Sequence, residues 1–202
     1  MFRLIKIVFN SFLIVLALIG FNAIGGQKYV ESAISGISAF IRNHAANNAK
    51  TIGNFSDLHE EFQIDNTVNI LGYKAVLAEH KVSGQRMCII DSGNKTIISQ
   101  EDIKGSNTEE KLRESISRLK YQAISFQDIR VLSKGTINAY GQTVPYAKFE
   151  AKSNRFPVSD LTGIVASLKT SDGSEKLIIS VSEKKKYSQL ISEEFFKNVK
   201  ES

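Results

Sequence analysis

The sequence predicts an α+β protein. An N-terminal membrane segment and an amphipathic helix come first, followed by an antiparallel meander sheet with two or three helices packed on one face. Three observations support this: an uncharged apolar run near the N-terminus, helical periodicity after it, and short strand-like segments separated by turns from about residue 57 onward. Hydrophobic residues make up 42% of the chain, which argues against disorder.

Residues 1–27 are expected to form a membrane anchor or signal segment. Arg3 and Lys6 precede an apolar run from Ile7 to Ile24 that contains no charge. At about 1.5 Å per residue, a helix of this length approaches the roughly 30 Å hydrocarbon core of a bilayer. Because the cations come first, we expect a single-pass protein with a cytoplasmic N-terminus and an extracytoplasmic domain. The anchor positions are Ile7, Phe12, Leu16, Ile19 and Ile24.

A cleaved signal peptide is the alternative interpretation of the same segment. The densest apolar part, from Phe12 to Phe21, has the length of a signal-peptide core. Ala23 and Gly25 are small residues at the spacing that a signal peptidase requires, so cleavage near Gly25 would give a secreted or periplasmic protein. No cysteine lies in or just after the run, which argues against a lipid-anchored lipoprotein.

Residues 28–52 have the pattern of an amphipathic helix. Val30, Ile34, Ile37 and Ile41 recur at helical spacing, with polar residues between them. We expect this helix to pack on the domain or to act as a stalk. Contact with the membrane surface or with a partner helix is the alternative.

Residues 53–202 are expected to form the extracytoplasmic α+β domain, with 57–120 and 121–202 as its two halves. Whether these halves share one sheet is left open by the sequence. Alternating apolar residues and turn signals predict strands over 69–80, 86–90, 95–99, 123–133, 136–140, 143–151, 161–168 and 176–181. The first three would form a meander. A capping-box pattern at Ser106 and Glu109 predicts a helix to about Lys120, and Ser182 is expected to cap a last helix that ends near Val199.

Two parts of the sequence resemble known folds. The C-terminal half, with long strands and a final amphipathic helix, resembles small extracytoplasmic α+β modules such as the PsbP-like fold. The stretch from Tyr73 to Ile103 resembles a PepSY-type meander. Each resemblance covers less than half of the chain, and neither transfers a functional residue to this sequence.

The residue patterns of known catalytic and metal sites are missing from the sequence. The single cysteine, Cys88, excludes an intrachain disulfide and a multi-cysteine metal site, and it reads as a core residue. Of His44, His59 and His80, only His59 lies in a motif-like stretch, and Gln63 stands where a zinc-binding H-E-x-x-H motif needs its second histidine. There is no nucleophile elbow, Walker A or dinucleotide fingerprint. We therefore expect no catalytic residue, no cofactor and no metal.

Lys184, Lys185 and Lys186 form the one cation run of the chain. Their expected position at the start of a helix is unfavourable for cations, which indicates a contact with anionic lipid heads or an acidic partner. The alternative is a solvated surface. Aromatic residues are not interleaved with these lysines, and the chain carries 26 Lys and Arg against 21 Asp and Glu, so nucleic acid is not the expected partner.

The sequence thus favours a non-enzymatic binding or assembly module of a bacterial-type cell envelope. It would be held by its N-terminal helix and would meet a protein partner at the sheet face or at an edge strand. One alternative is a secreted small-ligand carrier, which would have a large apolar cavity. Another is an enzyme whose site forms only in the fold, for example in a cleft where His59 or His80 meets two carboxylates.

Overall fold

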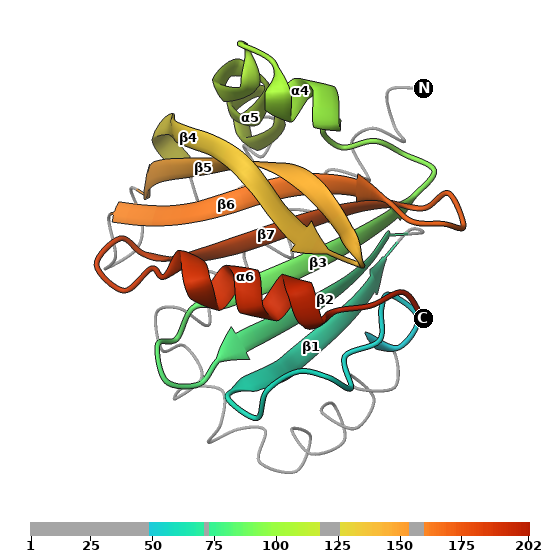
Figure 1. The fold of residues 1–202 in the computed structure, drawn as a ribbon. Coiled ribbons are helices and arrows are strands. Elements are labelled where there is room, and N and C mark those ends of the chain that lie inside the picture. The colour runs from blue at the N-terminus through green and yellow to red at the C-terminus, as the bar shows by residue number, and fades with distance from the viewer. Residues whose placement is uncertain (1–48, 71–72, 118–125, 154–159) are drawn as a thin grey trace.

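A seven-stranded antiparallel sheet forms the centre of the protein (Figure 1). The structure is a computed structural model and describes residues 49–70, 73–117, 126–153 and 160–202. In chain order, the elements are β1 (Phe62–Ile70), β2 (Tyr73–His80), β3 (Arg86–Gly93), α4 (Gln100–Lys104), α5 (Thr108–Ser117), β4 (Phe126–Ala139), β5 (Gln142–Ser153), β6 (Asp160–Lys169), β7 (Glu175–Glu183) and α6 (Gln189–Asn198). The strand order in the sheet is β1-β2-β3-β7-β6-β5-β4.

The expected membrane segment over 1–27 and nearly all of the expected helix over 28–52 lie outside the described residues. The same is true of every anchor position between Ile7 and Ile24. Within the described ranges, no helix is both long enough and apolar enough to cross a membrane.

One sheet contains strands from both halves of the domain. β1, β2 and β3 form one antiparallel meander, and β4, β5, β6 and β7 form another. The two meanders are joined by β3 and β7, which pair from Arg86 opposite Val181 to Gly93 opposite Glu175. The stretches 57–120 and 121–202 therefore share a single sheet.

Helices cover both faces of this sheet, whereas the sequence analysis expected them on one face (Figure 1). On one face, Phe195 and Phe196 of α6 are fully buried in the core that also contains Ile178 of β7. On the other face, helices α4 and α5 contribute Ile103 and Leu112 to a second core. The one-face expectation was wrong because the central strands have successive apolar residues, and successive residues of a strand point to opposite faces.

The first meander differs from the expected one. Strand β1, which begins at Phe62, was not predicted, and the expected strand over 69–80 belongs to two strands that pair as a hairpin, with Ile70 opposite Tyr73. The expected strand over 95–99 is wrong. The chain turns after Gly93 (φ +64°), and Ser99 caps helix α4 in a capping box with Asp102. This cap uses the donors that a strand would pair with a neighbour.

The described part of the expected strands over 123–133 and 136–140 is one irregular strand, β4. Gly135, which falls in the gap between these two expected strands, lies within β4, opposite Tyr146 of β5. A Cβ atom at Gly135 would lie 2.8 Å from the Tyr146 hydroxyl, so the glycine makes room for this ring. The register between β4 and β5 shifts twice before this point, which marks β-bulges in β4.

Two helix starts also differ from expectation. Helix α5 begins at Thr108, and the Glu109 carboxylate accepts a hydrogen bond from the Val131 N–H at 3.1 Å instead of closing a capping box with Ser106. Helix α6 begins at Gln189, because residues as far as Glu183 belong to β7. The segment between β7 and α6 is therefore a turn and not the first helical turn.

Candidate surface for an anionic partner

Lys184, Lys185 and Lys186 lie in the turn between β7 and α6. The Lys184 ammonium is 2.7 Å from Glu150 Oε1, and the Lys186 ammonium is 3.1 Å from Glu183 Oε2. Both lysine side chains remain more than half exposed. The lysines do not lie at the start of a helix, as the sequence analysis expected, because α6 begins only at Gln189. All three are exposed and lie at one corner of the sheet.

A row of polar residues crosses four strands beside this corner. Arg130 of β4 lies opposite Glu150 of β5, which lies opposite Thr162 of β6, which lies opposite Ser182 of β7. Thr162 is two residues before Ile164, a member of the α6-side core, so this polar row lies on the α6 face. The face is thus apolar under α6 and polar at the end where β6 begins and β7 ends. Figure 1 shows α6 lying across the strands of this face.

Two more lysines flank this polar row on β5. Lys148 and Lys152 are two residues before and after Glu150, so they share its face. The Lys148 ammonium lies 5.4 Å from the centre of the Tyr187 ring, within the range of a cation–π contact. The Lys152 ammonium is 3.9 Å from Asp128 Oδ2. We call the resulting surface the cationic sheet end, and its cations are Arg130, Lys148, Lys152, Lys184, Lys185 and Lys186.

Glu150 is the best-shielded acid of the cationic sheet end, with 16% of its side chain exposed. Arg130 Nη2 lies 3.7 Å from Glu150 Oε2, and Lys184 contacts the other oxygen. Ion pairs of exposed cations contribute only about 0–1 kcal/mol, since water solvates the separated charges well. Such pairs can exchange partners at low cost, so these cations are able to bind carboxylates or phosphates from another molecule.

The sequence pointed to the lysine run but not to the rest of this surface. The signal for Lys148 and Lys152 is present, because charged and apolar residues alternate along β5 from 148 to 152. Arg130 could not be placed in this way. Val131 packs in the core beneath α4 and α5, while Ile137 packs beneath α6, although an even spacing separates them. The bulge between Val131 and Ser133 reverses the face, and alternation cannot reveal it.

Both ring nitrogens of His80, at the end of β2, are hydrogen-bonded. Ser83 Oγ lies 2.9 Å from Nδ1, and Glu61 Oε2 lies 3.3 Å from Nε2. The Ser83 N–H also donates to Nδ1, which makes Nδ1 the acceptor and leaves the proton on Nε2. Ser83 Oγ in turn accepts from the Gln85 N–H, and the Gly84 N–H donates to the His80 carbonyl. Apart from the contact with Glu61, which precedes β1, these bonds lie within the turn that links β2 and β3.

The other histidines add little to this arrangement. His59 Nδ1 is 3.7 Å from the same Glu61 carboxylate, so the two histidines share one acid. His44 lies outside the described residues. In the described part of the chain, no group of three or more His, Cys, Asp or Glu side chains is arranged to hold a metal ion. Cys88 is 1% exposed, and burial raises the pKa of its thiol, as for a core residue.

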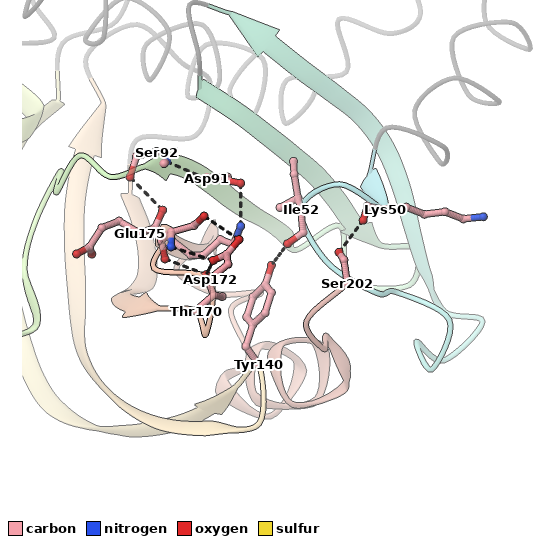
Figure 2. Close-up of polar contacts among 12 residues, drawn as sticks. Lys50, Ile52, Asp91, Ser92, Tyr140, Thr170, Asp172, Glu175 and Ser202 are labelled. Carbon is pink, nitrogen blue, oxygen red and sulfur yellow. Dashed lines mark hydrogen bonds and ion pairs between the residues drawn. The ribbon is translucent and has the colours of Figure 1, made fainter.

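At the opposite end of the α6 face, polar groups are buried and paired (Figure 2). The Lys176 ammonium donates to Asp91 Oδ2 at 2.8 Å, and Asp91 Oδ1 accepts from the Gly93 N–H at 2.9 Å. The Tyr140 hydroxyl donates to the Ile52 carbonyl at 3.0 Å, and burial raises its pKa. With its charges paired inside the protein, this cluster has a structural role.

An open hollow lies beside the start of α5. Its lining is polar and charged, unlike the enclosed apolar cavity of a small-molecule carrier. The lining residues are Ser106, Asn107, Glu109, Glu110 and Arg113.

Comparison with known proteins yields little beyond these observations. No protein-family model matches the chain, and no curated protein matches its sequence. A solution structure of cyanobacterial PsbP from Synechocystis sp. PCC 6803 is similar to it at a TM-score of 0.35 and 8% sequence identity, over 65% of this chain and 80% of that chain. A likeness of this size carries no argument about function.

Proposed function

We propose that this chain is a non-enzymatic binding or assembly module of a bacterial-type cell envelope that docks an acidic partner protein. The N-terminal apolar run, with its preceding cations, supports a membrane-anchored protein whose domain is extracytoplasmic. The single observation that carries the docking proposal is the cationic sheet end. There, six cations gather from two strands and one turn, and four of them are already within ion-pair distance of carboxylates.

The lysine run and the first described residues of the chain lie at opposite ends of α6. Ala49 and Ile52, near the start of the described residues, pack in the α6-side core together with Val199, and Asn54 forms a bridge to Lys200. The chain therefore enters the domain at the C-terminal end of α6. Lys186 lies before the other end of this ten-residue helix, about 15 Å away. The exposed lysine run is thus separate from the surface on which the first described residues join the domain, and it is accessible to a partner protein.

The test is binding of a fluorescent oligoglutamate peptide to the full chain in uncharged detergent micelles. The protein is purified from the membrane fraction of a bacterial host, and recovery at the full mass of 22.4 kDa checks that the leader is retained. We expect binding that weakens as salt rises, because exposed charges are screened. Joint substitution of Lys184, Lys185 and Lys186 by alanine is expected to reduce the affinity by about tenfold or more, equal to about 1.4 kcal/mol.

The matched control replaces three exposed lysines at other positions, Lys50, Lys169 and Lys197, by alanine. This variant has the same net charge and is expected to bind nearly as well as the unmodified protein. Equal loss in both triple variants would contradict the proposal, since it would mean that only net charge matters. The unmodified protein could instead bind vesicles rich in phosphatidylglycerol but not oligoglutamate, with vesicle binding lost in the Lys184, Lys185 and Lys186 variant. That result would contradict an acidic protein partner and would identify an anionic membrane as the partner.

A further inference from the structure

The Glu150 carboxylate occupies a shielded position within the cationic sheet end. Its side chain is 16% exposed, whereas the side chains of its two cationic partners, Arg130 and Lys184, are 64% and 55% exposed. The acid is therefore covered while the cations reach it from the solvent side. Arg130 and Lys184 each have more N–H donors than they use in binding the Glu150 carboxylate, so donors remain for another acceptor.

Thr162 lies directly opposite Glu150 on the neighbouring strand and on the same face. It is 4% exposed, and its hydroxyl oxygen has no hydrogen-bond partner. A buried hydroxyl without a partner is uncommon, because desolvation then goes uncompensated. Thr162 thus holds an unused donor and acceptor beside an acid and two exposed cations. Removing this hydroxyl breaks no hydrogen bond within the protein, so it is not needed for the fold.

We propose that Glu150 fills a carboxylate-binding site, and that the acidic partner docks by placing an Asp or Glu side chain there in its stead. This inference rests on the proposed function and names the chemistry of its site. Arg130 and Lys184 would transfer their contacts from Glu150 to the incoming carboxylate, and the Thr162 hydroxyl would donate a third. The planar guanidinium of arginine matches the two oxygens of a carboxylate well.

Glu150→Gln tests this competition. Glutamine keeps the size of the side chain and removes the competing charge, so we expect oligoglutamate to bind the full chain about tenfold more tightly, equal to about 1.4 kcal/mol. The matched control is Glu183→Gln, which removes one acid from the same surface, where Glu183 pairs with Lys186. The gain from Glu150→Gln is expected to exceed the gain from Glu183→Gln severalfold. Equal gains would overturn the inference, because they would reflect general electrostatics alone.

Thr162→Val provides the second arm. Valine has nearly the shape of threonine, and unfolding midpoints of both proteins check that the fold is kept. We expect weaker binding of oligoglutamate by Thr162→Val and normal binding by Thr162→Ser. Unchanged binding by Thr162→Val would exclude the hydroxyl from the site.

The lysine triple variant separates this inference from the proposed function. If that variant loses binding but neither Glu150→Gln nor Thr162→Val has the expected effect, the docking surface stands and only the exchange mechanism is rejected. If the triple variant binds normally, the proposed function itself fails.

Discussion

Asp172 shows at the scale of one residue how a side chain organises a turn. In the turn between β6 and β7, its Oδ1 accepts from the Ser174 N–H at 2.9 Å and from the Thr170 hydroxyl at 2.7 Å. Its Oδ2 accepts from the Ser174 hydroxyl at 3.1 Å. These bonds, the Ser174 N–H foremost, lower the pKa of Asp172 to about 2. They favour the charged carboxylate, so the turn is most stable when Asp172 is ionised.

This shift predicts a pH dependence of stability. Because the pKa of Asp172 is lower in the folded protein than its usual value of 3.8, its contribution is present above the usual value and is lost as pH falls toward about 2. Asp172→Asn should therefore be less stable than the unmodified protein at neutral pH, with a difference that shrinks in this acidic range. Urea unfolding across pH measures it, with Asp160→Asn, at the other end of β6, as the control. A difference that does not change with pH would contradict the assignment.

Single residues were the least predictable part of the candidate site. The lysines at 184–186 are a run in the sequence and were found directly. Glu150 and Thr162 were not, because their importance depends on lying opposite each other in the sheet. Neither residue type is unusual in a strand. The register between β5 and β6 places the Thr162 hydroxyl, which has no hydrogen-bond partner, next to Glu150, which pairs with Lys184.

At the scale of elements, helix α6 shows where local patterns stop being sufficient. The helical spacing of apolar residues places Leu190, Phe195 and Val199 on one face, and Phe195 and Val199 are fully buried, but Leu190 is 76% exposed. The helix begins later than its pattern indicated, because a distant residue decides the start. The Gln85 side chain, at the β2–β3 turn, accepts from the Ser188 N–H at 2.8 Å and donates to the Ser192 hydroxyl. Sequence periodicity contains no information about this contact.

Gln85→Leu should therefore loosen α6 from the sheet. Gln85 is fully buried, and its loss leaves the Ser188 N–H without its partner inside the protein. We expect a loss of about 1–3 kcal/mol in the free energy of unfolding, the usual cost of an unsatisfied buried polar group. Urea unfolding gives this value, and hydrogen exchange shows whether the α6 amides lose protection first.

The control for this change is Gln142→Leu. Gln142 donates one exposed hydrogen bond to the Lys169 carbonyl, so its substitution should cost less than about 0.5 kcal/mol. Similar costs for the two variants would show that Gln85 does not hold the helix.

At the scale of the whole molecule, the long-range pairing of β3 with β7 turns two meanders into one sheet. The sequence predicted the α+β class and most strands of the second meander, because alternation and turn residues are local signals. It left open whether one sheet or two would form. Whether one sheet forms depends on the pairing of β3 with β7, which lie about ninety residues apart in the chain. It also depends on helices that cover both faces of the joined sheet. The join contains a buried ion pair, since Asp91 and Lys176 lie opposite each other.

Removing one partner of this pair should weaken the join strongly. Lys176→Met leaves Asp91 as a buried charge without its counter-ion, and we expect a loss of about 3–5 kcal/mol. Adding Asp91→Asn should recover much of this loss, because asparagine is neutral and can still accept from the Gly93 N–H. Lys169→Met, an exposed change on β6, is the control and should cost less than about 0.5 kcal/mol. Urea unfolding followed by circular dichroism measures all four proteins. If the double variant is no more stable than Lys176→Met, the isolated charge is not the cause, and the lysine must stabilise the join by packing alone.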